Sequence, residues 1–353
     1  MIIPESGPGI PTIDVSETTI SHLDELTRHI RDGLGDMSEA EFFDAVDACA
    51  PNAEDIVPDE TALLRRLASH IGPKAVLLSL PPETVAAAGP TPSYHRSSEE
   101  QQLISSDICR ALAISLSGLY AFGNRAFHGG SMHHDIIFDP NATNSSAKDQ
   151  EMRLHVDGLY VNRNPGHYPA PGQPNLNLSP DFLTLHFIRN HEQVPTVLVF
   201  PEWDALTEDT REILSQPCLY LNKTLPPLSV LYGDNPADPW IRYVTDEEYI
   251  GNAPDQATRN ALGELNGHLA ARQVTVAMKA GQILLFDNRR LLHGRASRSR
   301  TNLPPPAEWR WQRRVHCVTD PERIQQDGLP PRQVNTDTVY AYGQRNLPLR
   351  NNV

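Results

Sequence analysis

The segment Arg153-Leu154-His155-Val156-Asp157 and the distant His293 have residue types and a spacing that could hold a metal ion. Side chains two positions apart on an extended strand point to the same face, so His155 and Asp157 could present an imidazole and a carboxylate together. His293 follows residues 281–286, which are typical of a strand that leads into a turn. Two histidines and one carboxylate on one face of a metal form the facial triad of non-haem Fe(II) oxygenases. We therefore predict a site of this type.

A basic segment follows His293, and its alternation indicates a second function. On a strand through residues 308–315, the side chains of Arg310, Gln312 and Arg314 would lie on one side. A planar guanidinium can bind a carboxylate through two hydrogen bonds. We therefore expect Arg310 and Arg314 to face the interior, where they could bind anionic molecules beside a metal.

Two other interpretations of these residues stay open. The group His133-His134-Asp135 could also bind a metal, although a structural role at the end of a strand explains it as well. Zinc could occupy two histidines and an aspartate as in a hydrolase, but that site would leave Arg310 and Arg314 without a role.

Composition limits the class of protein. The 353 residues are 39% hydrophobic, which is enough for a sizeable core, and the net charge of −14 argues against nucleic-acid binding, which depends on clustered Lys and Arg. No apolar run approaches the roughly 20 residues of a membrane span, and the N-terminus does not read as a signal peptide. The four cysteines form no Cys-x-x-Cys pair and are expected to be reduced thiols. These features predict a cytoplasmic protein without nucleic-acid or membrane partners.

Residues 1–125 are expected to form a mainly helical flank. Capping-box spacing predicts two helices, one from Ser21 to Leu34 and one that begins at Ser38. The other expected elements are a helix from about residue 60, a short strand at 75–78, and a long helix from 103 that ends at Gly123.

Short β-prone runs separated by turn residues predict a sandwich or barrel in residues 126–320. The expected strands are 136–138, 154–160, 182–188, 196–200, 219–221 and 274–278, with one helix inserted at 255–272. Residues 163–179 are rich in Pro, Gly and Asn and are expected to form a loop over the site. With a C-terminal extension at 321–353, the whole chain, 1–353, is predicted to be a single domain.

Several motifs occur in a recognisable order. They are His155-x-Asp157, residues 179–185, residues 231–234, the string Asp-Asn-Arg-Arg-x-x-His-Gly-Arg at 287–295, and Arg310-Trp311 with Arg314. Over roughly residues 75–320 this order resembles the clavaminate synthase-like family of Fe(II)/2-oxoglutarate-dependent oxygenases, of the TauD-like superfamily, near the asparagine and arginine β-hydroxylases. The resemblance implies a mainly β fold with flanking α: a double-stranded β-helix (jelly roll) core with N-terminal helices and a helical insertion.

The resemblance also implies roles at the metal and at the co-substrate. His155, Asp157 and His293 would ligate Fe(II), with Asp157 in place of the glutamate that most hydroxylase-type relatives carry. Arg310 would bind the distal carboxylate of 2-oxoglutarate. The family threonine that contacts 2-oxoglutarate falls at Val197 by strict register, and Thr196 beside it is the candidate for that contact.

Further roles concern the substrate. Arg314 matches an arginine that meets the substrate carboxylate, Ser145 a serine of the amino-acid pocket, and Tyr160 an aromatic residue near the substrate. Relatives that act on arginine hold its side chain with an aspartate, whereas this chain has Val244 at that position, and Asp246 is the nearest acid. The sequence thus points away from a basic amino acid.

The implied activity is hydroxylation of an unactivated C–H bond, with Fe(II) as cofactor and 2-oxoglutarate and O2 as co-substrates. The substrate would be a free amino acid or an amino-acid-derived small molecule in natural-product or antibiotic biosynthesis. Desaturation, cyclisation or epoxidation by the same cofactor chemistry are alternatives. A catalytically inactive metal-binding relative is an alternative of another class.

Overall fold

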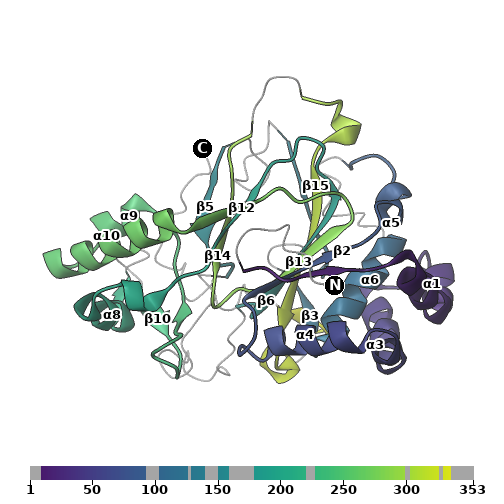
Figure 1. Ribbon diagram of the computed structural model, residues 1–353, viewed down its shortest axis with the longest axis horizontal. Helices are drawn as coiled ribbons and strands as arrows, with labels where there is room; N and C mark the ends of the chain where they lie inside the picture. The colour runs from purple at the N-terminus through teal and green to yellow at the C-terminus, as the bar shows by residue number, and fades with distance from the viewer. Residues whose placement is uncertain are drawn as a thin grey trace.

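The computed structural model describes residues 9–92, 103–125, 129–139, 150–158, 179–219, 227–298, 303–325 and 329–334. A larger and a smaller β-sheet occupy the middle of the molecule, and helices cover both ends (Figure 1). The predicted fold class, mainly β with N-terminal helices and a helical insertion, is confirmed.

The larger sheet has eight strands drawn from all parts of the chain. Their order is β1 (Thr12–Asp14), β2 (Ala75–Ser79), β13 (Gln282–Asp287), β6 (Phe182–Arg189), β15 (Trp311–Val318), β3 (Tyr120–Asn124) and β16 (Gln333–Val334), and β4 (His134–Ile137) also pairs with β15. β1 and β16 are the parallel members. The predicted helical flank and the C-terminal extension therefore both contribute strands to the core sheet.

The smaller sheet has four antiparallel strands in the order β12 (Gln273–Val276), β7 (Thr196–Val199), β14 (Leu292–Arg295) and β5 (Met152–His155). Two short pairs accompany it: β10 (Leu231–Tyr232) with β11 (Trp240–Ile241), and β8 (Pro217–Leu219) with β9 (Leu228–Ser229).

Alternating side chains hold the two sheets together. On β13, Ile283 and Leu285 pack towards the N-terminal helices, whereas Leu284 and Phe286 join Leu198 of β7 in a separate apolar cluster between the sheets. Because successive strand residues point to opposite faces, each run of apolar residues fills two layers. The core is thus a sandwich with helices outside both sheets.

The helices follow the predicted pattern in part. On the side of the larger sheet lie α1 (Glu17–Leu26), α2 (Arg28–Gly33), α3 (Glu39–Ile56), α4 (Pro58–Ala68), α5 (Glu83–Ala86) and α6 (Ser105–Leu116). Beside the smaller sheet lie α8 (Glu208–Ser215), α9 (Glu247–Gly251) and α10 (Gln256–Ala271) (Figure 1). Short 3₁₀ turns occur at Trp203–Ala205, Pro306–Glu308 and Pro321–Ile324.

Side-chain caps explain where two of the predicted helices begin. Ser38 caps α3, because its hydroxyl accepts from the Glu41 N–H and the Glu41 carboxylate accepts from the Ser38 N–H, which confirms the predicted capping box. Asp255 caps α10 by accepting from the Thr258 N–H at 2.7 Å, as expected for the inserted helix.

Two helix predictions were wrong. The helix expected to begin at Ser21 begins instead after Ser16, whose hydroxyl accepts from the Thr19 N–H, and it breaks at Thr27 into two helices. The helix expected to end at Gly123 ends at Leu116, and residues 120–124 form β3. At Gly123 an added Cβ would lie 2.1 Å from the Gly130 carbonyl oxygen, so close backbone approach explains this glycine.

Arg313 links three elements through buried ion pairs. It lies on β15, is 2% exposed, and its guanidinium contacts Asp107 of α6 and Asp135 of β4. We expect Arg313→Met to destabilise the fold by about 3–5 kcal/mol, because it leaves buried carboxylates without this partner. Chemical denaturation measures the effect, and Arg272→Met, which breaks the exposed pair with Glu202, is the control, with a cost of at most about 1 kcal/mol. Equal losses in the two variants would contradict the assignment.

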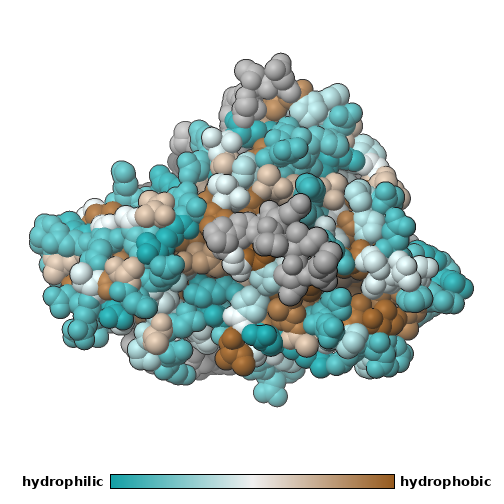
Figure 2. All heavy atoms as spheres, in the orientation of Figure 1, coloured by the Kyte–Doolittle hydropathy of each residue, from teal (hydrophilic) through white to brown (hydrophobic). Residues whose placement is uncertain are grey.

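Hydrophilic side chains dominate the face shown in Figure 2, as expected for amphipathic helices that bury one side. Among the described residues, Ile71 is the one large hydrophobic side chain classed as exposed. None of the described helices combines the length and the apolar character required to span a membrane.

Candidate metal centre

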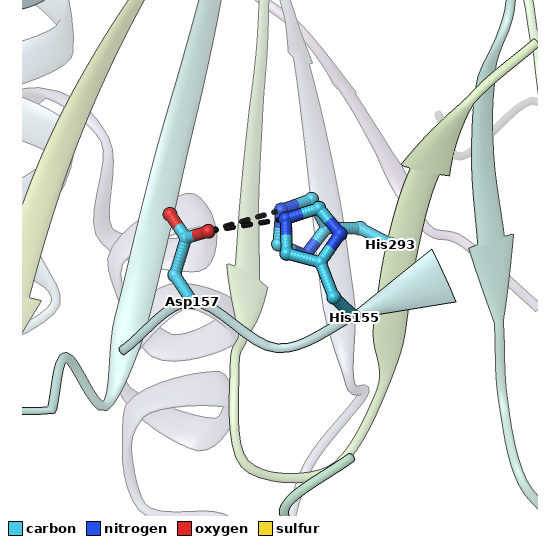
Figure 3. Close-up of side chains that lie close together, drawn as sticks. All are labelled: His155, Asp157 and His293. Atoms are coloured by element: carbon cyan, nitrogen blue, oxygen red, sulfur yellow. Dashed lines mark ion pairs between the residues drawn. The ribbon is translucent and has the colours of Figure 1, made fainter. Parts of the chain in front are cut away.

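The three predicted metal ligands lie together. The Nε2 atoms of His155 and His293 are 3.3 Å and 3.7 Å from the same carboxylate oxygen, Oδ1 of Asp157. One ligand atom from each residue falls within 4.8 Å of the other two, and the Asp157 carboxylate points towards both imidazole rings (Figure 3). Within the described residues, this is the one group of three or more such side chains with this geometry.

Strand pairing positions the two histidines. His155 on β5 is directly opposite His293 on β14, and side chains of paired residues project to the same face. Their ring centroids are 4.3 Å apart. The pairing shifts register between His293 and Arg295, and an added Cβ on Gly294 would lie 2.6 Å from the Met152 carbonyl oxygen. The glycine after His293 therefore permits the close approach of the two ligand strands.

The sequence predicted that a strand positions Asp157, but Asp157 lies beyond the end of the strand. The expected strand 154–160 ends at His155, and Gly158 follows Asp157 in a left-handed conformation, φ +76°. Pro180 and Ser179 lie so close to Gly158 that an added Cβ would meet them at about 3 Å. A turn rather than an extended segment therefore directs the carboxylate at the histidines.

The protonation states suit a divalent cation. Nδ1 of His155 is 2.8 Å from the Arg153 carbonyl oxygen, which can only accept, so Nδ1 carries a proton and Nε2 is the nitrogen that faces Asp157 and could bind a metal. Burial and the neighbouring His155 lower the pKa of His293 to about 3, which keeps its imidazole neutral. Burial raises the pKa of Asp157, but Arg314 and three histidines (His155, His316 and His293) hold it well below its usual range. Two imidazoles and one ionised carboxylate fit Fe(II).

The other carboxylate oxygen of Asp157 is held by β15. Arg314 Nη1 donates to Oδ2 at 2.5 Å, and His316 Nε2 lies 3.3 Å from the same atom. Arg314 Nη2 lies 2.8 Å from His134 Nδ1. Sequence reasoning gave His316 no role, although the alternation that grouped Arg310 with Arg314 also places His316 on that face.

A pocket between the two sheets adjoins the metal ligands. Its lining includes Thr196 and His293 from the smaller sheet, and Gln312 and Arg314 from β15, with Arg310 just before that strand. The predicted grouping of Arg310, Gln312 and Arg314 on one side is therefore present, and Thr196, not Val197, faces the pocket.

Arg310 is a buried cation whose surroundings favour an anion. It is 5% exposed, it donates to the Gln312 side chain, and no carboxylate pairs with it in the part of the chain that the structure describes. Burial, with the nearby Arg295 and Arg298, lowers its pKa to about 9. A carboxylate arriving in the pocket would neutralise this concentration of positive charge.

The remaining candidates lie elsewhere. Asp246 pairs with Arg153, an exposed arginine two residues before His155. Ser145, Tyr160 and residues 163–178 of the expected loop lie outside the described residues. The alternative group at residues 133–135 is drawn into other contacts: His133 with Arg110, His134 with Arg314, and Asp135 with Arg313.

The string at residues 287–290 builds the turn that leads from β13 to β14 and so to His293. The Asp287 carboxylate lies 2.6 Å from Nδ1 of His70, Arg289 pairs with Asp181, and Arg290 pairs with Asp238 at 3.0 Å. These charged residues have structural partners, which the motif in the sequence did not reveal.

Comparison with known proteins agrees with this arrangement. Residues 186–316 match the family model described as "Taurine catabolism dioxygenase TauD, TfdA family". This segment includes His293, Arg310 and Arg314.

Solved structures share the fold. The non-heme iron oxygenase OrfP, in complex with Fe and alpha-ketoglutaric acid, superposes with a TM-score of 0.70 at 20% identity, over 89% of this chain and 96% of that one. An asparagine oxygenase in complex with Fe(II), 3-hydroxyasparagine and succinate gives 0.72 at 18% identity, over 92% and 99%. The predicted jelly-roll class is thereby confirmed, and residues 186–316 are similar to the TauD/TfdA dioxygenase family.

Proposed function

We propose that this protein is an Fe(II)/2-oxoglutarate-dependent oxygenase that hydroxylates a C–H bond of a free amino acid or an amino-acid-derived small molecule. The observation that carries the proposal is the ligand group His155, Asp157 and His293, which opens onto a pocket lined by Arg310. The matching family model and the two iron oxygenases of the same fold support it.

Each residue has a defined task in this proposal. His155, Asp157 and His293 would hold Fe(II), which together with 2-oxoglutarate and O2 supplies the oxidising chemistry that converts 2-oxoglutarate to succinate and CO2. Arg310 would bind the distal carboxylate of 2-oxoglutarate and orient it, and Thr196 would contact it from β7. The pocket lies between the sheets, where few water molecules can compete for these hydrogen bonds.

The substrate side is proposed from Arg314. Its guanidinium lies between Asp157 and His134, next to the metal ligands, where it could bind a substrate carboxylate. The solved relatives were determined with hydroxyasparagine or with L-Arg, both small amino acids. Asp246, which pairs with Arg153, is proposed to meet a substrate amine. Ser145 and Tyr160 remain proposed pocket residues.

Anaerobic titration tests the cofactor assignment. Fe(II) and 2-oxoglutarate together should give the weak visible charge-transfer band of the chelate, and free amino acids, dipeptides and carrier-bound amino acids should then be screened for succinate release and hydroxylated product. Absence of the band with folded protein would overturn the proposal. A band without any turnover of 2-oxoglutarate would identify an inactive metal-binding relative instead.

Arg314→Ala should separate substrate binding from co-substrate binding. Losing one partner of a buried charge pair costs about 2–5 kcal/mol, so we expect KM for the substrate to rise at least about 30-fold. Arg314 also holds Oδ2 of Asp157, so Fe(II) affinity should fall as well, but saturating Fe(II) should restore the chelate band because Arg310 is untouched. An unchanged KM for the substrate at saturating Fe(II) would contradict a substrate role for Arg314.

A further inference from the structure

Asn288 makes contacts that the proposed function leaves unexplained. Its side-chain oxygen accepts from the Asp157 N–H at 2.8 Å, and its amide nitrogen donates to the Asp157 carbonyl oxygen at 3.0 Å. The same nitrogen also donates to the Pro180 carbonyl oxygen at 2.9 Å. One 2%-exposed side chain thus satisfies both backbone groups of a proposed metal ligand.

The need for such a contact follows from where β5 ends. β5 ends at His155, and the Val156 N–H still donates to the Tyr243 carbonyl oxygen at 3.1 Å. Asp157 is the next residue, and no strand continues the backbone hydrogen bonding there. An unpaired buried N–H or C=O is costly and leaves the backbone free to rotate. The side-chain amide of Asn288 therefore makes the hydrogen bonds to Asp157 that a neighbouring strand would otherwise make. The Ser179 hydroxyl also donates to the Asp157 carbonyl oxygen, at a longer distance of 3.3 Å.

Asn288 is itself held in place. Its backbone N–H donates to the Asp181 carbonyl oxygen at 2.9 Å, and it lies in the turn between β13 and β14. His293 follows five residues later on β14. The turn that leads to His293 therefore also binds the backbone of Asp157, which lies 131 positions from Asn288 in the chain.

We propose that Asn288 is a positioning residue that fixes the Asp157 backbone before the metal arrives and so sets the affinity of the site for divalent cations. Arg314 and His316 act on the carboxylate oxygen only, and neither contacts the Asp157 backbone. This inference rests on the proposed metal site. It concerns only the hydrogen bonds that hold the Asp157 backbone and does not depend on the identity of the substrate.

The chain contains a matched control in Asn190. This asparagine is 5% exposed, accepts from the Val194 N–H at 3.2 Å, and donates to the carbonyl oxygens of Val194 and Met278. It makes the same three-bond contact to a backbone segment that carries no metal ligand. Replacing either asparagine with alanine should lower the melting temperature of the metal-free protein to a similar extent.

The test is titration of the full-length metal-free protein with Co(II) or Mn(II), without 2-oxoglutarate. Asn288→Ala should weaken metal binding about 10- to 100-fold, as is typical when a partner of a metal ligand is removed. Asn288→Asp should fall between, because a carboxylate keeps the bond from the Asp157 N–H but cannot donate. Asn190→Ala should stay within about twofold of wild type. Wild-type affinity in Asn288→Ala, or an equal loss in Asn190→Ala, would overturn the inference.

A measurement on the wild-type protein removes any dependence on how the variants fold. In hydrogen exchange without metal, the Asp157 amide should be protected as strongly as the amides of β5, although it lies outside that strand. Free exchange at Asp157 would overturn the inference. If the wild-type protein bound no metal at all, the proposed function would fail, whereas the exchange result would still decide whether Asn288 fixes this backbone.

Discussion

His293→Ala is expected to reduce turnover to background, a fall of at least about a thousandfold. The variant removes one of three ligands, and with it the several kcal/mol that a correctly held metal contributes. His293 is the informative choice because only the pairing of β14 with β5 brings it to His155. The measurements are the chelate band, Co(II) affinity and succinate release, and all three should be lost together.

His268→Ala is the control for this result. His268 is also a buried histidine, 8% exposed on α10, and it accepts from the Glu202 N–H at 3.2 Å, away from the three ligands. The His268→Ala variant should be less stable than the wild-type protein but should still give the chelate band with Fe(II) and 2-oxoglutarate. Retention of the band in His293→Ala, with the protein folded, would place the metal elsewhere.

Arg310→Ala should weaken 2-oxoglutarate binding by about 30- to 5,000-fold. This range corresponds to the roughly 2–5 kcal/mol lost when a buried carboxylate loses its hydrogen-bonded cation. Fe(II) alone should still bind, because no metal ligand changes. The dissociation constant of 2-oxoglutarate, followed by the chelate band, measures the effect. Arg310→Lys should have an affinity between those of the wild type and Arg310→Ala, because lysine keeps the charge but cannot form the bidentate hydrogen bonds.

The same variant should not destabilise the ligand-free protein. Burial and repulsion from Arg295 and Arg298 lower the pKa of Arg310 to about 9, and a base whose pKa falls on folding disfavours the folded state wherever it is charged. Removing it should therefore leave the melting temperature of the apoprotein at pH 7 unchanged or higher. A large drop in that temperature would contradict this expectation and would show that the hydrogen bond to Gln312 outweighs the cost of burying the charge.

The sequence predicted those parts of the fold and of the site that depend on local patterns. Ser38 with Glu41 is a cap a few residues long, and strand alternation alone grouped Arg310 with Arg314. The three proposed metal ligands could be singled out because two of them, His155 and Asp157, are two positions apart.

What the sequence did not predict depends on contacts between distant segments. The end of β5 at His155 is set by neighbours, so the role of Asn288 at Asp157 could not be seen from spacing. Gly123 was interpreted as a helix end because its reason, the nearby backbone of residues 130–131, lies on another segment.

The pocket at Arg310 is bounded by both sheets, with Thr196 on β7 and Gln312 on β15. A dicarboxylate bound to the metal at one end and to Arg310 at the other would connect the two layers across the pocket, in addition to the apolar contacts between the sheets. At a hundredfold excess over its dissociation constant such a ligand adds about 2.7 kcal/mol to the stability. Amide exchange should therefore fall in β7 and β15 when the ligand is present at that concentration.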